Sequence, residues 1–280
     1  MNNTNHQLQL TNFWKTGNYQ STVDRVAQGE QEVKNIAKML QERAQVEQKY
    51  QIELRKWSST WEDKFNNGKE YGSALEGIQA TIQAAQMTAE THDAAADQLR
   101  KLARKNGQWR KSRYIKNVSD EIREALALKR RFESVQRDWI NLNTEEIKAK
   151  NAYWAACQAE EQAERSGEGD LNTLSNESER LSQEYDEALQ SRMDHRDKYV
   201  TEMESIFGLA QDQEKDRKKF VKSQLLEMQE ILDTTCREEP KLTNDALKDI
   251  LQGMDVEDDI NLWNRFLGPA SSNQIPELYE

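Results

Sequence analysis

Apolar residues recur every three or four positions along most of this 280-residue chain, the spacing of one face of an α-helix. One stripe runs from Val33 to Phe65 and a second from Leu75 to Leu102. The pattern resumes at Phe132, and a further long stripe extends from Leu171 to Leu232. No stretch alternates with the period of two that a half-buried strand requires. The pattern therefore predicts an all-α protein built from long helices.

Turn-forming residues divide these stripes. Asn66-Asn67-Gly68 predicts either the end of the first helix or a kink in it, and residues 166–170 (SGEGD) are the clearest turn in the chain. Between Gly107 and Ser119 the stripe only loosens. The first proline is Pro240, and we expect Glu239-Pro240 to end the last long helix because the residue before proline disfavours helix.

The ends of the chain are predicted to differ from its middle. Residues 1–20 are polar and expected to be loose, apart from a small aromatic cluster. Residues 243–252 predict a short helix, and the tail from Phe266 is expected to be extended.

Composition favours an elongated molecule. Hydrophobic residues make up 36% of the chain and charged residues 32%, which is too polar to fill a large spherical core. Long amphipathic helices must bury their apolar stripe against other helices. We therefore expect a helical rod that forms a homodimer along a narrow seam.

Charge is distributed unevenly. Residues 100–137 hold 13 basic and 4 acidic side chains, a local charge of +9, whereas residues 138–280 hold 16 basic and 33 acidic side chains, or −17. The overall charge of −11 would argue against an anionic partner, but surface charge acts over about one Debye length, roughly 8–10 Å in cellular salt. The basic block therefore favours an anionic partner.

Several classes of function are disfavoured. The chain shows no phosphate-binding glycine loop, nucleophile elbow or metal-ligand spacing, so we expect no enzyme, no cofactor and no metal site. His92 lies within an apolar stripe and is interpreted as a hydrogen-bonded core histidine. Cys157 and Cys236 match no redox or metal motif, and Cys157 continues an apolar stripe, which favours a reduced core residue in a cytoplasmic protein. The N-terminus lacks signal-peptide features, and no run of about 18 apolar residues is present.

Four segments together resemble a known family. They are residues 12–19 (NFWKTGNY), 41–50 (QERAQVEQKY), 68–73 (GKEYGS) and 152–157 (AYWAAC). They are similar to the motifs of F-BAR domains, most closely of the pacsin/syndapin type. Trp109 and Trp139 resemble a tryptophan pair of that branch. Residues 253–261 are more similar to the related proline-serine-threonine-phosphatase-interacting proteins.

The resemblance covers about residues 12–265. It implies an F-BAR domain over residues 1–265, followed by an extended tail or linker at 266–280. It also implies an elongated, crescent-shaped antiparallel dimer of long helices whose concave face binds anionic membranes and senses or generates curvature. We expect such a protein at the cytosolic face of plasma or endosomal membranes, in endocytosis or membrane–cytoskeleton remodelling, with phosphatidylserine and phosphoinositides as ligands. Actin-regulatory or endocytic proteins are expected partners only through a region outside this chain, and nucleic acid is not an expected partner.

The candidate lipid-binding residues are basic side chains from the basic block and from a second group further along. They are Arg100, Lys101, Arg104, Lys105, Arg110, Lys111, Arg113, Lys116, Lys129, Arg130, Arg131, Lys215, Lys218, Lys219 and Lys222. The second group, which also includes Arg217, has an alternative interpretation as ion-pair partners of Glu214 and Asp216.

Pacsin-like members also carry a short apolar loop that inserts into the bilayer. The resemblance places it at residues 115–119, with Ile115 and Val118 as a weak membrane wedge; an ordinary helix or kink is the alternative. Asp120 and Glu121 follow directly, and burying acidic groups in a bilayer is costly. The lysine-rich stretch of the branch is replaced by residues 140–144 (INLNT), which argues against strong tubulation.

Two other functions stay open. The −17 region and the missing lysines favour a protein-binding adaptor of the same fold with weak or no lipid remodelling. A spectrin-like spacer rod is also compatible with the helical pattern, although residues 12–19 argue against it.

Overall fold

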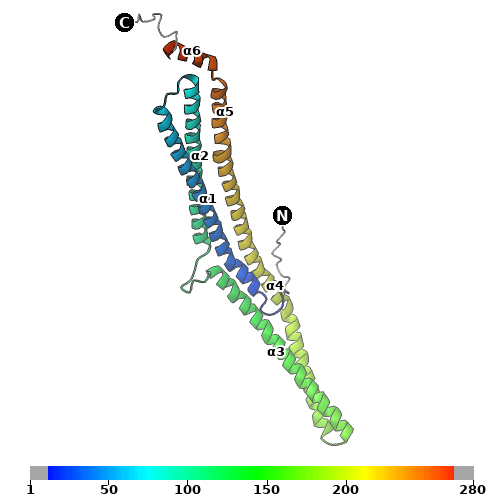
Figure 1. Ribbon diagram of the computed structural model, residues 1–280. Helices are drawn as coiled ribbons and strands as arrows, with labels where there is room; N and C mark the ends of the chain where they lie inside the picture. The colour runs from blue at the N-terminus through cyan, green and yellow to red at the C-terminus, as the bar shows by residue number, and fades with distance from the viewer. Residues whose placement is uncertain (1–11, 268–280) are drawn as a thin grey trace, which may run out of the picture. The chain divides into compact units, whose positions relative to one another are not determined.

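The computed structural model describes residues 12–267, and these are almost entirely helical (Figure 1). Four long helices are followed by a π-helical turn and two short helices. Their bounds are α1 Gln20–Asn66, α2 Gly72–Arg113, α3 Arg123–Ser166, α4 Leu171–Asp233, the π-turn Thr234–Glu238, α5 Glu239–Gln252 and α6 Val256–Leu267. The only β-type pairing in this part of the chain is an isolated bridge between Lys116 and Ile122. The predicted all-α fold of long helices is confirmed.

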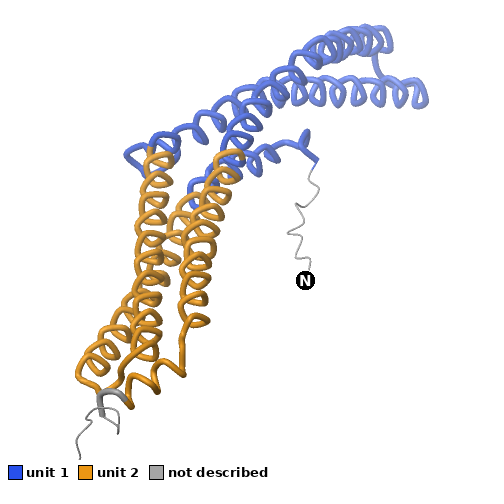
Figure 2. Tube along the Cα trace, turned by 90° about the horizontal axis from the view of Figure 1, so that it is seen from above, with its two compact units in different colours: residues 1–31, 112–218 blue, residues 32–111, 219–280 orange. Residues whose placement is uncertain are grey.

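The chain forms two compact units, each built from two separate stretches of sequence (Figure 2). Unit 1 comprises Met1–Gln31 and Ser112–Lys218, and unit 2 comprises Glu32–Lys111 and Lys219–Glu280. Each unit has its own hydrophobic core.

The core of unit 1 joins the start of α1 to α3 and α4. Phe132 is fully buried, and its ring stacks on Tyr19 with the centroids 5.1 Å apart. Met203 and Ile206 of α4 complete this cluster. The Oε1 atom of buried Gln136 accepts a hydrogen bond of 2.9 Å from the Gly17 amide, which fixes the entry to α1. Tyr19 is therefore a structural residue of this core.

The core of unit 2 lies between α1, α2 and the end of α4. Leu40, Leu99 and Leu102 are buried at its centre, and alanines between them let the helices approach closely. Trp109 stacks on Phe220 with the rings nearly parallel, at 3° and a centroid distance of 4.1 Å.

Several predicted helix ends are confirmed. α1 ends at Asn66, and α3 ends at Ser166 with Gly167 in the left-handed conformation, its amide donating to the Ala163 carbonyl.

At the start of α2, the carboxylate of Asp259 accepts hydrogen bonds from the Ser73 and Ala74 amides. These acceptors satisfy amides that a helix N-terminus leaves without partners. A residue of α6 thus caps α2.

The predicted helix end at Glu239-Pro240 is wrong. The helical path continues through Pro240, which occupies the first turn of α5. The preceding five residues, Thr234–Glu238, form a π-turn. A proline lacks an amide and clashes with the carbonyl four residues earlier, and a wider turn relieves both problems.

The loss of apolar spacing after Gly107 corresponds to a real interruption between two helices. α2 ends at Arg113, and a loop over residues 114–122 leads to α3, so the alternative of an ordinary helix or kink is wrong. α6 was not predicted, and it includes Phe266 and Leu267, where the extended tail was expected to begin. The predictions for residues 1–11 and 268–280 fall outside the described residues. The predicted boundary between residues 265 and 266 lies within α6, which continues to Leu267.

Candidate functional site

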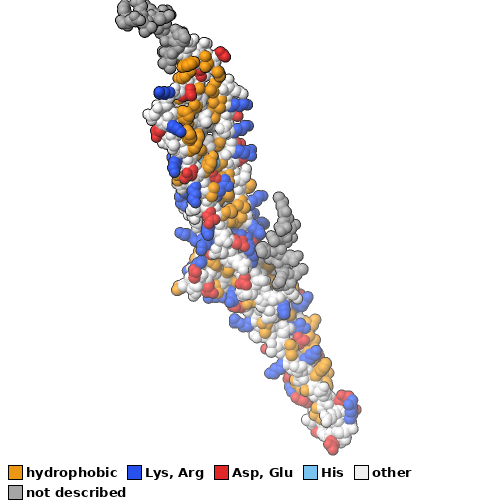
Figure 3. Space-filling model, viewed as in Figure 1, with side chains coloured by type: hydrophobic (Ala, Val, Ile, Leu, Met, Phe, Trp, Pro, Cys, Tyr) orange, Lys and Arg blue, Asp and Glu red, His pale blue; other side chains and the backbone are white. Residues whose placement is uncertain are grey.

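The candidate lipid-binding residues lie on three helices and one loop. Arg100 to Arg113 occupy the last third of α2, Lys116 is in the loop, Lys129 to Arg131 are near the start of α3, and Lys215 to Lys222 are on α4. Both units carry members of this set. On the face drawn in Figure 3, Lys and Arg side chains are interspersed with Asp and Glu side chains.

Some of the candidate cations already have acidic partners. The ion pairs are Arg100 with Asp97, Lys105 with Glu227, Arg113 with Asp216, Lys116 with Asp120, Lys129 with Glu133, and Lys218 with Glu214. Most of these side chains are well exposed, and exposed pairs are worth only about 0–1 kcal/mol. They can exchange a carboxylate for a phosphate at little cost.

A second set of candidate cations is exposed and makes no ion pair with any residue in the range 12–267. Its members are Lys101, Arg104, Lys111, Arg130, Arg131, Lys215, Lys219 and Lys222. We call these eight residues the open cations. They are the strongest candidates for contact with an anionic ligand, because no protein carboxylate has to be displaced.

The alternative interpretation, in which the second basic group on α4 forms ion pairs with Glu214 and Asp216, is correct for part of that group. Arg217 is buried, and its guanidinium donates to both oxygens of Glu214, with Nε 2.7 Å from Oε2 and Nη2 2.7 Å from Oε1. Arg25 of α1 donates to the same carboxylate at 2.9 Å. Burial alone would raise the pKa of Glu214, but the hydrogen bonds from Arg217 and Arg25 outweigh it and lower the pKa to about 2. This network is part of the packing of unit 1.

The close approach of α1 to this network depends on Gly29. A Cβ atom at that position would lie 2.6 Å from the Tyr114 hydroxyl and 2.9 Å from Cδ of Arg217. Both distances are shorter than real carbon contacts, so a side chain there would displace the arginine. The single glycine in this part of α1 is therefore required by the ion-pair network.

The loop between α2 and α3 presents both wedge candidates to solvent. Val118 is fully exposed and Ile115 is about two-fifths exposed. The Oδ1 atom of Asn117 accepts hydrogen bonds from the Ser119 and Glu121 amides, at 3.0 and 2.8 Å, which gives the loop a defined turn. Asp120 has φ of 61°, a conformation that few non-glycine residues adopt.

The structure also reveals a polar cluster that the sequence pattern did not indicate. Glu47 of α1 is only 3% exposed, and its Oε2 atom lies 2.6 Å from Nδ1 of His92 on α2. His92 was predicted to be a hydrogen-bonded core histidine; it makes the hydrogen bond, with a partner that the sequence did not identify, but its side chain is 15% exposed and only partly buried. Burial would raise the pKa of Glu47, yet hydrogen bonds from His92 and Arg43 lower it overall. The missed signal was a charged residue, Glu47, at a helical position that faces the core.

Comparison with known families gives a match at the N-terminal end. Residues 18–94 match the model of the FCH family, described as Fes/CIP4 and EFC/F-BAR homology domain. Among the described residues, no helix combines the length and apolar content needed to cross a lipid bilayer.

Curated relatives match most of the chain. Protein kinase C and casein kinase substrate in neurons protein 2 of Gallus gallus is 26% identical over 290 residues, which covers 97% of this chain and 65% of the relative. The corresponding protein 1 of Danio rerio is 24% identical and covers 96% and 64%. The chain thus spans less than two thirds of the length of these relatives.

Solved structures show the same fold. The EFC/F-BAR domain of Drosophila Syndapin/PACSIN aligns with a TM-score of 0.78 at 24% identity, covering 96% of this chain and 98% of the other. The Hof1p F-BAR domain aligns with a TM-score of 0.66 at 15% identity, covering 92% and 96%.

Proposed function

This chain has the F-BAR fold and carries the FCH homology region, and on this premise we propose that it is a homodimeric scaffold that binds anionic membranes and senses or generates their curvature. The resemblance to pacsin/syndapin F-BAR domains is the observation that carries the proposal most directly. Phosphatidylserine and phosphoinositides are the proposed ligands, at the cytosolic face of plasma or endosomal membranes during endocytosis or membrane–cytoskeleton remodelling.

The electrostatics of α2 support binding to phosphates. Residues 100–113 hold seven basic and no acidic side chains. A basic residue near an anionic leaflet contributes about 1 kcal/mol. The eight open cations of one chain could therefore contribute several kcal/mol, and a dimer would offer twice as many, so binding would be strong but reversible and sensitive to salt.

An exposed apolar stripe supports dimerisation through α1. Met39, Val46, Tyr50 and Trp57 are spaced by seven, four and seven residues, so they share one face of the helix. Each is between two and three fifths exposed. An apolar row of this length on a protein surface is typical of an interface. We propose that a second copy of the chain covers it.

Vesicle co-sedimentation tests the proposal. The protein is mixed with phosphatidylserine/phosphoinositide vesicles at low and at high salt, and the pellets are imaged by electron microscopy. We expect binding at low salt that weakens as salt rises, with short or sparse tubules because the lysine-rich stretch is replaced at residues 140–144.

A charge-reversal triplet gives a sharper test. Lys129→Glu, Arg130→Glu and Arg131→Glu together should weaken vesicle binding by at least about tenfold, given about 1 kcal/mol per basic residue. The matched control is Lys34→Glu, Lys38→Glu and Lys49→Glu, which changes the net charge equally at exposed positions of α1 outside the candidate set. Equal effects of the two triplets would mean that only net charge matters, and the proposed site would be wrong.

A protein-binding adaptor of the same fold is the second candidate function. It is favoured by the −17 charge of residues 138–280 and by the ion pairs that already occupy Arg113 and several other candidate cations. If anionic vesicles fail to sediment the protein at low salt while the dimer stays intact, the adaptor becomes the better account of the chain.

A further inference from the structure

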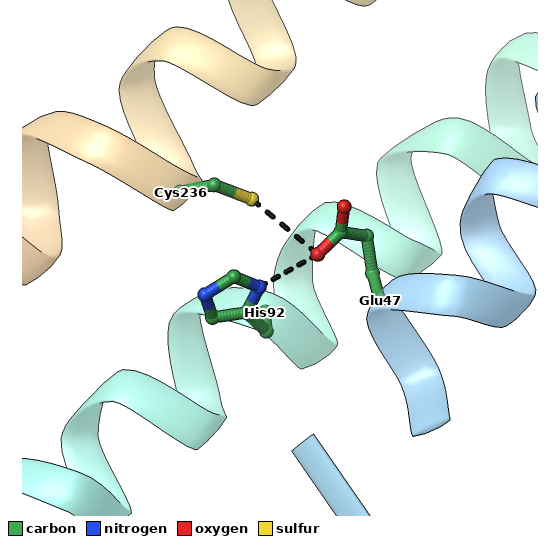
Figure 4. A group of neighbouring side chains, drawn as sticks. All are labelled: Glu47, His92 and Cys236. Carbon is green, nitrogen blue, oxygen red and sulfur yellow. Dashed lines mark hydrogen bonds and ion pairs between the residues drawn. The ribbon is translucent and has the colours of Figure 1, made fainter. Parts of the chain in front are cut away.

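Three side chains with metal-binding atoms meet in unit 2, outside the candidate lipid-binding set (Figure 4). Glu47 comes from α1, His92 from α2 and Cys236 from the π-turn Thr234–Glu238. The distance from Nδ1 of His92 to Oε2 of Glu47 is 2.6 Å, and Sγ of Cys236 lies 3.8 Å from the same oxygen. The three potential ligand atoms all lie within 4.8 Å of one another.

From this geometry we propose that Glu47, His92 and Cys236 form a binding site for a transition-metal ion of the Zn²⁺ class. This inference is independent of the proposed membrane function. A carboxylate, an imidazole and a thiolate are the three ligand types that Zn²⁺ takes in proteins. Three protein ligands leave a fourth position for water.

Two of the three distances between the ligand atoms require only small adjustments, and the third, from Sγ of Cys236 to Nδ1 of His92, is within 4.8 Å. With metal–ligand bonds of about 2.0–2.3 Å in a tetrahedral arrangement, neighbouring ligand atoms lie about 3.3–3.7 Å apart. The His92–Glu47 pair, at 2.6 Å, must therefore open by under about 1 Å, and the sulfur, at 3.8 Å from Oε2, is already near its required separation. Rotation of side chains about their χ angles can supply movements of this size.

Neighbouring residues hold two of the ligands in place. Arg43 donates to Oε1 of Glu47, the oxygen that does not face His92, so Oε2 stays directed at the cluster. The ring of Tyr50 packs against the imidazole of His92 at a centroid distance of 4.5 Å. Partners that orient ligands in this way are typical of metal sites. Ionised Glu47 and Cys236 together carry a charge of −2, and the divalent metal and Arg43 together carry +3, so the site has a net charge of +1.

The π-turn explains how the third ligand reaches the site. It inserts a wider turn between α4 and α5, and Cys236 is its central residue. π-turns inside helices frequently occur at functional positions. In this chain the turn also accommodates Pro240, so one distortion serves both purposes.

Metal binding has a defined proton balance. The metal replaces the hydrogen between Nδ1 of His92 and Oε2 of Glu47, and a neutral imidazole keeps its single proton by moving it to Nε2. The Cys236 thiol loses its proton to solvent and binds as the thiolate. Burial raises the pKa of this thiol, so it is protonated without metal at neutral pH. The thiol therefore releases one proton for each metal ion that binds.

Cobalt substitution and zinc competition test the site in the purified chain. The protein, reduced and freed of metal with a chelator, is titrated with Co²⁺ and then with Zn²⁺. We expect one equivalent of Co²⁺ per chain, with the sulfur-to-cobalt charge-transfer band of a thiolate ligand and the visible bands of a tetrahedral ion. Zn²⁺ should displace it and raise the melting temperature, because a ligand that binds only the folded state stabilises it.

Two variants and one control make the outcome specific. Cys236→Ser should abolish the charge-transfer band. Loss of a residue that only orients a metal ligand lowers metal affinity about 10- to 100-fold, and His92→Gln, which removes a ligand itself, should lower it at least as much. Cys157→Ser removes the other cysteine, which lies in unit 1, and should change neither result. Helicity measured by circular dichroism shows whether each variant is folded.

The proposal is overturned by any of three results in folded protein. These are no binding by the wild type, binding that persists in Cys236→Ser, or binding that Cys157→Ser abolishes. None of these outcomes bears on vesicle binding, because the cluster contains none of the candidate lipid-binding residues.

Discussion

Replacing Glu214 with glutamine should make the stability of unit 1 less sensitive to acid. In the wild type, the carboxylate is about one fifth exposed and accepts hydrogen bonds from Arg217 and Arg25. Glutamine has the same shape but no charge, so it resembles the protonated acid. The variant therefore isolates the contribution of ionised Glu214.

The magnitude follows from the pKa of this group. Its ordinary value is 4.5, and the two arginines lower it to about 2 in the folded protein. One pKa unit corresponds to about 1.4 kcal/mol, so the ionised form stabilises the fold by about 3 kcal/mol. Because the folded pKa is the lower one, this contribution is complete above about pH 4.5 and disappears as pH falls toward 2.

Urea unfolding at a series of pH values measures this effect. The free energy of unfolding of Glu214→Gln should lie about 3 kcal/mol below that of the wild type at pH 7, and the difference should shrink through the window between about pH 4.5 and 2. Glu42→Gln, an exposed carboxylate in an i,i+4 pair with Lys38, is the control and should show a difference under about 1 kcal/mol throughout. A large difference for Glu214→Gln that does not change with pH would refute the electrostatic origin and indicate a packing effect.

Three further perturbations test the fold and the loop. Phe132→Ala should lower the free energy of unfolding by about 3–5 kcal/mol in urea titrations, because the ring is fully buried; a loss under about 1 kcal/mol would mean that the site collapses. Asp259→Ala should speed hydrogen exchange at the Ser73 and Ala74 amides, which lose their acceptors; unchanged exchange would show that the cap is not formed. Val118→Asp should leave the melting temperature unchanged, because the side chain is fully exposed, but should weaken vesicle binding if the loop enters the bilayer; unchanged binding would exclude a wedge.

The sequence predicted the helices well where a local signal was present. The end of α1 at Asn66 and the turn after Ser166 follow from residues that locally disfavour helix, and the structure places both where predicted. The continuation through Pro240 could not be predicted in this way, because it depends on a π-turn in the preceding residues. α6 was missed because its docking depends on Asp259 reaching the start of α2, a contact across 186 residues.

For the candidate site, too, features with a local signal in the sequence could be predicted, and features that depend on distant contacts could not. The basic block was visible as composition, but which of its members are already paired depends on residues far away in sequence, such as the pairing of Arg113 with Asp216. The spacing of His92 predicted a hydrogen-bonded core histidine, and the structure shows the hydrogen bond on a side chain that is only partly buried. Its contact with Glu47 and the approach of Cys236 could not be foreseen, because three helical segments must pack before these side chains meet.

Each unit is built from two separate stretches of the chain, and this affects how the protein folds while it is being synthesised. The core of unit 1 needs Tyr19, Phe132 and Met203 together, and the core of unit 2 needs Leu40, Leu99 and Ile231. Since each core takes residues from α4, neither can close on a ribosome until most of the chain has emerged. The apolar stripes of helices α1 to α3 therefore stay exposed until α4 has been synthesised. Contacts between residues so distant in sequence also form slowly. A nascent chain of this kind has a long interval in which chaperones can bind and in which a premature stop leaves both cores incomplete.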